Sequence, residues 1–200
     1  MFPWKQPKHH LLDLPAELRE RIFLFAVTSQ KPVVTFLLDP YQRDSYQEAV
    51  QPAITRVSRQ VRREALPLFY DSNEFILHTD GSKASDVQRW LQCSESHLPK
   101  LTHLAFWVRY IPFPSEHYTP SGALSVDLRH NKLTGLWQVD EQWRWITVVR
   151  KPTDLNQHGQ LLVELLGELV SGKSRTTASA GDYEALLRDL TARYSKANPV

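Results

Sequence analysis

The stretch LLDLPAELRERIFLFAV, residues 11–27, decides how the rest of the chain must pack, because it is apolar on more than one side. Pro15 suits the first position of a helix, where its missing N–H costs nothing. At about 100° per residue, one quadrant of that helix holds four apolar residues, Leu14, Leu18, Ile22 and Phe25. Phe23, Leu24 and Val27 point to the other side. The second apolar side is therefore buried either by the rest of this chain or by another protein.

Composition narrows the class of protein. The chain has 200 residues, of which 42% are hydrophobic, enough for the core of one domain. Lys and Arg number 24 against 22 Asp and Glu, so there is no electrostatic case for nucleic-acid binding. The N-terminus lacks the apolar run of a signal peptide, and no stretch approaches the ~20 apolar residues of a membrane span. We expect an intracellular protein, cytoplasmic or nuclear, without membrane association.

Apolar periodicity outlines the remaining elements. After the first helix we predict a strand at 31–38, a polar connection or hairpin return at 39–52, and a helix that Pro52 opens and Pro67 ends or bends. Further helices are predicted at 82–92, 157–170 and 182–194. Strands are predicted at 74–78, 101–110, 124–130, 133–140 and 143–150, the last four antiparallel. The expected fold is α+β, with N-terminal helices, a central antiparallel sheet and C-terminal helices.

One motif suggests chemistry. GELVSGKS, residues 167–174, matches the phosphate-binding loop G-x-x-x-x-G-K-[ST]. That loop should follow a buried strand and open a helix, whereas RTTASAGD follows here, and only residues 175–200 remain for the rest of such a fold. Zinc-binding H-E-x-x-H and nucleophile G-x-S-x-G motifs are absent, and the single cysteine, Cys93, excludes an internal disulfide. We predict a protein that is not an enzyme and needs no cofactor or metal, with nucleotide binding as a remote alternative.

Two stretches resemble a known family. LPAELRERIFLFAV at 14–27 resembles the first helix of an F-box, and PAITRVSRQVRREALPLFYDSNEF at 52–75 resembles the second part of fungal F-box-like and two-EXR proteins. Typical members pair LPxELRxxI with CRQxRxEALxxFYxxNxF. The resemblance covers residues 11–78, with an inserted strand and loop at 28–51. Residues 79–200 would form a mixed α/β partner-binding region that packs as one unit with the first segment.

The resemblance implies a non-enzymatic adaptor that links a target protein to a Skp-cullin ubiquitin ligase. In F-box proteins the first helix contacts a Skp-type linker subunit and the C-terminal part selects the target. The docking residues carried over are Leu14, Pro15, Leu18, Ile22, Val57 and Val61. For the unknown target, the candidates are whichever of five aromatic residues are exposed, namely Trp107, Tyr110, Trp137, Trp143 and Trp145. The same residues are equally suited to the core. The alternative is a stand-alone scaffold or interaction domain with no ligase association, in which Leu14, Pro15 and Ile22 would be mostly buried.

Overall fold

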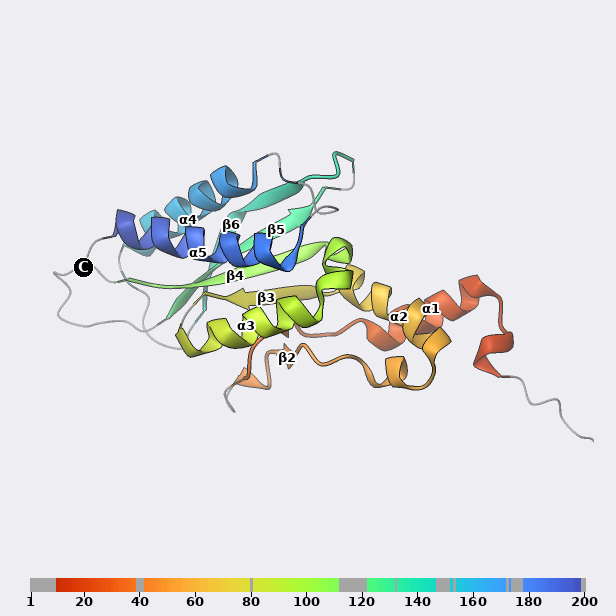
Figure 1. Ribbon diagram of the computed structural model, residues 1–200. Helices are drawn as coiled ribbons and strands as arrows, with labels where there is room; N and C mark the ends of the chain where they lie inside the picture. The colour runs from red at the N-terminus through yellow and green to blue at the C-terminus, as the bar shows by residue number, and fades with distance from the viewer. Residues whose placement is uncertain are drawn as a thin grey trace, which may run out of the picture.

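The computed structural model describes residues 10–38, 42–79, 81–111, 122–131, 133–146, 152, 154–171, 173 and 178–198, with the backbone alone at 81 and 82. Within these ranges the helices are η1 (Leu11–Asp13), α1 (Ala16–Val27), η3 (Ala53–Arg56), α2 (Arg59–Ser72), α3 (Gly81–Cys93), η4 (Glu95–Lys100), α4 (Leu155–Val170) and α5 (Ala180–Ala197), where η marks a 3₁₀ helix. The predicted α+β class is confirmed, with helices at both ends of the chain (Figure 1).

Six strands form one mixed sheet. They are β1 (Val33–Val34), β2 (Gln47–Glu48), β3 (Glu74–His78), β4 (His103–Arg109), β5 (Ala123–His130) and β6 (Trp137–Ile146), in the order β2-β1-β3-β4-β5-β6. β4, β5 and β6 are antiparallel, as predicted. β2, β1, β3 and β4 instead pair in parallel, which the antiparallel prediction did not include. The helical connections explain this for β1 with β3 and for β3 with β4, because parallel neighbours need a crossover and α2 and α3 lie between these paired strands.

Individual strands also differ from their predicted ranges. The strand predicted at 31–38 is only two residues long, and β2 pairs with it in parallel, so the hairpin alternative for 39–52 is wrong. The two strands predicted at 133–140 and 143–150 form the single strand β6, with 147–150 outside the described residues. A pairing irregularity opposite Asp127 absorbs the polar residues between the two predicted strands.

Side chains point alternately to the two sides of each strand, so the sheet has an apolar face and a face of mixed polarity. Phe75, Phe106 and Val126 belong to the apolar face and are fully buried. Helices α3, α4 and α5 lie on this side, with Trp90 of α3 against Phe75 at 5.2 Å between ring centroids (Figure 1). On the other face, Tyr46 and Phe36 pack against Trp107. The core therefore lies mainly between the sheet and the three helices that follow β3.

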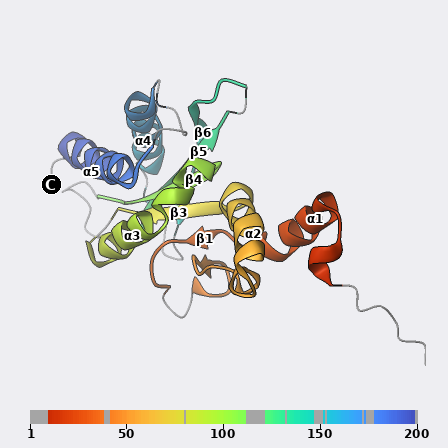
Figure 2. The same cartoon turned by 45° about the vertical axis from the view of Figure 1, so that its right-hand side comes forward.

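The first two α-helices project from one end of this layered unit (Figure 2). α1 contacts α2 and η3, whereas α4 and α5 pack against each other at the far side of the sheet. β3 belongs to the first predicted segment and β4 to the second, and they pair along the whole length of β3. The segments 11–78 and 79–200 thus share one sheet.

Pro52 precedes the short helix η3, whereas α2 begins at Arg59 and continues through Pro67 to Ser72. The predicted start of this helix at Pro52 and an end at Pro67 are therefore wrong. A proline inside a helix costs about 3 kcal/mol through its missing hydrogen bond and its ring. Phe69 and Tyr70 follow in the same helix and are both buried. Burying two such rings is worth roughly 1.5–3 kcal/mol each, which offsets the cost of the proline.

Candidate protein-docking surface on the first helix

One side of α1 packs into the protein. Phe23 is 0% exposed and Val27 is buried, and both face α2. These are the two buried residues of the helix, so its buried apolar contact with the rest of the chain is confined to this side.

The opposite side of α1 is apolar and faces solvent. Phe25 is 91% exposed, Leu18 is 46% exposed and Ile22 is 40% exposed. The three lie within one quadrant of the helix, where an ordinary surface helix carries charged or polar residues. Single exposed apolar residues are normal, but adjacent ones on one helix indicate an interaction surface. We call Leu18, Ile22 and Phe25 the α1 docking face.

A two-point ion pair fixes the orientation of α1. Arg19 donates from Nε to Glu64 Oε2 at 2.8 Å and from Nη2 to Glu64 Oε1 at 3.1 Å. Its Nη1 also donates to the Leu14 carbonyl at 2.6 Å. The hydrogen bond from Arg19 lowers the pKa of Glu64, with help from Gln60, and the same contact raises the pKa of Arg19. With Arg19 held toward α2, the docking face is turned outward.

A buried amide fixes the other end of α1. Asn73 Nδ2 donates to the Val27 carbonyl at 3.0 Å and to the Phe69 carbonyl at 2.7 Å. Its Oδ1 accepts from the Ser29 backbone N–H at 2.6 Å. Asn73 thereby satisfies backbone groups at the ends of α1 and α2 that would otherwise be buried without partners. Arg19 lies in the first stretch of the resemblance, and Glu64 and Asn73 lie in the second. Their hydrogen bonds join the two stretches.

The start of α2 carries the cap and the arginines of the second stretch. Ser58 is the N-cap, and its Oγ accepts from the Val61 N–H at 3.1 Å. Four arginines near this end, Arg56, Arg59, Arg62 and Arg63, are exposed. Arg62 donates from Nε to the Thr55 carbonyl at 3.0 Å, which ties η3 to α2.

The six predicted docking residues differ in their exposure to solvent. Leu18, Ile22, Pro15 and Val57 are exposed, and Leu14 is half-buried. Val61 is buried in the core, so its assignment to a docking surface is wrong. Phe25, the most exposed residue of the face, was absent from the predicted set although its helical position pointed to it. Because Pro15 and Ile22 are exposed, the mostly buried first helix expected for a stand-alone scaffold is not observed.

The predicted target-recognition residues are mainly core residues. Trp107, Tyr110 and Trp137 are buried, so they are wrong as surface anchors. Tyr110 donates its hydroxyl to Asp154 Oδ1 at 2.7 Å, and Trp107 is covered by Tyr46. Trp143 and Trp145 are half-buried against the core.

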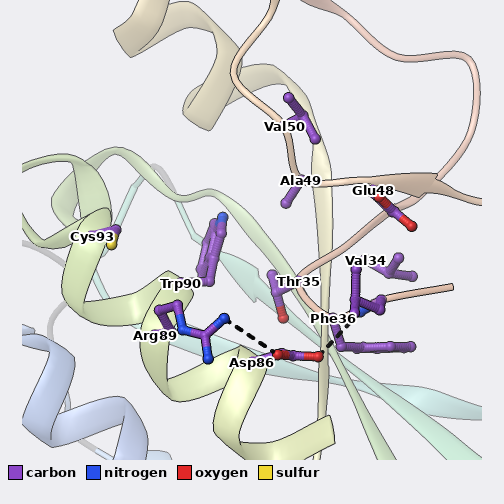
Figure 3. Close-up of a pocket in the computed structure, with 11 residues that line it drawn as sticks. Val34, Thr35, Phe36, Glu48, Ala49, Val50, Asp86, Arg89, Trp90 and Cys93 are labelled. Carbon is purple, nitrogen blue, oxygen red and sulfur yellow. Dashed lines mark hydrogen bonds and ion pairs between the residues drawn. The ribbon is translucent and has the colours of Figure 1, made fainter.

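A pocket of 320 Å³ lies between the end of β1, the end of β2 and α3 (Figure 3). Its wall includes Trp90, and Leu37 and Val50 line it as exposed apolar residues. Asp86 accepts from the Leu37 N–H at 3.4 Å and lies 3.8 Å from Arg89, so the loop that follows β1 is tied to α3. Cys93, an exposed thiol, also lines the pocket. This surface was not predicted, because its residues come from segments that are far apart in sequence.

The phosphate-loop motif lies in an unsuitable structural context. Its first residues, from Gly167 to Val170, are the last turn of helix α4. A phosphate-binding loop follows a strand, which is what directs its backbone N–H groups at the phosphates. Gly172 and Ser174 lie outside the described residues.

No family model matches the chain, and neither a curated protein nor a solved structure is significantly similar to it. Within the described ranges, no helix combines the length and hydropathy that crossing a membrane requires.

Proposed function

We propose that the protein is a non-enzymatic interaction adaptor whose α1 docking face binds another protein. The observation that carries the proposal is the opposition of two apolar sides on one helix, Phe23 turned inward and Phe25 turned outward. Burying one large apolar side chain in an interface is worth ~1.5–3 kcal/mol, so Leu18, Ile22 and Phe25 supply the anchors of a stable contact.

The resemblance at residues 11–78 suggests the partner, a Skp-type linker subunit of a cullin ubiquitin ligase. The contacts of Arg19 with Glu64 and of Asn73 with Val27 support treating the two resembling stretches as one unit. Ala26 of α1 and Ala53 of η3, close to the two ends of the inserted segment, line a common pocket. Leu18, Ile22 and Phe25 remain exposed, which supports an open α1 docking face.

An adaptor also needs a surface for its target. The pocket between the end of β1, the end of β2 and α3 supports that role better than the tryptophans, because Leu37 and Val50 are exposed beside it. Its lining residues lie at β1, at β2 and on α3 and none lies on α1, which supports separate places for a linker subunit and a target.

Co-expression with a Skp-type subunit, followed by gel filtration, tests the proposal. We expect one shared peak for the wild type and none for Phe25→Asp or Ile22→Asp. Phe25→Ala should weaken the complex by roughly 10–100-fold, the equivalent of burying one large side chain.

Leu133→Asp is the matched control. Leu133 is 95% exposed in the turn before β6, so the same loss of an apolar group and gain of a charge occur far from α1. Circular dichroism confirms that each variant folds. Separate elution of the wild type, under conditions in which a known F-box protein binds, would refute the linker subunit as partner. The scaffold alternative would then remain.

A further inference from the structure

Three side chains with metal-binding groups meet on the mixed face of the sheet. Glu74 is on β3, His103 is on β4 and Asp127 is on β5, and we call them the Glu–His–Asp cluster. Glu74 and His103 are direct partners in the parallel pairing, and Asp127 lies opposite Ala105, two residues along the strand from His103. The three strands lie side by side at the centre of the sheet, so backbone register holds these groups together (Figure 1).

The donor atoms of the cluster are close enough to share one ion. One ligand atom from each residue lies within 4.8 Å of the others. His103 Nε2 is 3.4 Å from Asp127 Oδ2 and His103 Nδ1 is 3.8 Å from Glu74 Oε2, and a single ion would use one of these two ring nitrogens. None of the three side chains is fully exposed, and Asp127 is buried. The cluster therefore differs from the exposed acidic groups that are common on protein surfaces.

A cationic group already lies between the two carboxylates. Arg144 Nη2, from β6, is 3.1 Å from Glu74 Oε1 and 3.0 Å from both oxygens of Asp127. The two carboxylates carry two negative charges, and the guanidinium carries one positive charge. A divalent ion would neutralise both carboxylates, so it matches the charge of the cluster better than the arginine does.

The position of Arg144 also allows its side chain to move away from the two carboxylates. It comes from the edge strand β6 and its side chain is 49% exposed, so it can turn into solvent. The pairing of β5 with β6 is irregular at Asp127, between Val126 and Leu128. Such irregularities redirect side chains and occur often beside functional sites.

We propose that Glu74, His103 and Asp127 bind a divalent transition-metal ion in place of Arg144 Nη2. One imidazole and two carboxylates suit ions such as Mn²⁺ and Zn²⁺ that accept mixed nitrogen and oxygen ligands. Three protein ligands leave further coordination positions for water or for an anionic group.

The test is a titration of the full chain with Mn²⁺, with free Mn²⁺ followed by electron paramagnetic resonance. We expect one site per chain. His103→Ala and Asp127→Asn should each weaken binding at least tenfold, because each removes a ligand. Arg144→Gln should tighten binding several-fold, because it removes the competing cation, and Arg144→Lys should tighten it less. Misfolding does not account for a gain in affinity, so Arg144→Gln keeps the test decisive even if another variant unfolds.

Two variants serve as controls. Asp140→Asn removes a carboxylate of β6 that pairs with Arg129, outside the cluster, and His10→Ala removes an exposed histidine. Both should bind Mn²⁺ as the wild type does. The proposal is overturned if the wild type has no stoichiometric site, if His103→Ala binds equally well, or if Arg144→Gln binds no tighter. Binding by Arg144→Gln alone would also overturn it, since Arg144 would then keep the ion out of the native protein.

Discussion

Arg19 and Glu64 form a two-point ion pair, with Nε to Oε2 at 2.8 Å and Nη2 to Oε1 at 3.1 Å, that joins α1 to α2 across 45 positions of sequence. Among the described residues, this is the ion pair that joins a side chain of α1 to a side chain of α2. The contact holds α1 in the rotation in which Phe23 is buried and Phe25 is exposed.

The first prediction concerns pH. Because Arg19 lowers the pKa of Glu64 in the folded chain, the ionised pair stabilises the attachment of α1 above the unfolded value of about 4.3. This contribution is lost as pH falls through the lower folded-state pKa. We expect the hydrogen-exchange protection factors of α1 amides to decrease below about pH 4 in the wild type. Glu64→Gln should have lower protection at neutral pH and a flatter pH profile. Identical profiles would contradict this role.

The second prediction contrasts two phenylalanines of α1. Phe23→Ala should lower the free energy of unfolding by about 3–5 kcal/mol, because Phe23 is fully buried. Phe25→Ala should change it by less than about 0.5 kcal/mol, because its side chain faces solvent. Urea denaturation followed by circular dichroism measures both. Similar losses in the two variants would show that the helix is rotated from the orientation described.

The third prediction concerns the buried amide of Asn73. Asn73→Ala should destabilise the protein by about 1–3 kcal/mol, because the Val27 carbonyl and the Ser29 N–H lose a buried partner. Asn73→Asp should be more destabilising, because an oxygen would replace the Nδ2 donor between two carbonyl groups. Denaturant unfolding gives the order of stability. Equal stability of Asn73→Asp and the wild type would argue against the donor role of Nδ2.

The fourth prediction compares two glycines of α4. A Cβ on Gly159 would overlap the Trp143 ring near its attachment point, so Gly159→Ala should destabilise by about 1–3 kcal/mol. A Cβ on Gly167 meets no atom within 4 Å, so Gly167→Ala should stabilise by roughly 0.5–1 kcal/mol through helix propensity. Thermal unfolding of both variants checks the sign of each effect. If Gly159→Ala unfolds at the same temperature as the wild type, α4 and β6 are packed less closely than the contact between Gly159 and Trp143 indicates.

The helices were predictable because their determinants are local. Apolar residues at helical spacing locate α3, α4 and α5 to within a few residues, and Val87 and Leu91 face the core as their spacing indicates. Pro67 shows the limit of local rules. Whether α2 continues past Pro67 depends on the free energy gained by burying Phe69 and Tyr70. The residues that bury them come from the rest of the fold.

The candidate docking face was predictable in part. The sequence placed Leu18, Ile22 and Phe25 on one side of a helix, but it left open which of the two apolar sides the protein covers. The aromatic residues were harder to interpret, since a tryptophan suits a core and an interface equally well. Trp107 and Trp137 are buried because of the elements that cover them, and those elements are distant in sequence.

By itself, the sequence determined where α1, α3, α4 and α5 lie and that the first helix carries two apolar sides, because helical periodicity depends only on neighbouring residues. The tertiary structure alone decided that Phe23 is covered and Phe25 is not, that β1, β3 and β4 are parallel, and that Glu74, His103 and Asp127 meet. These features depend on strand register and crossover connections, which result from packing between segments far apart in the chain.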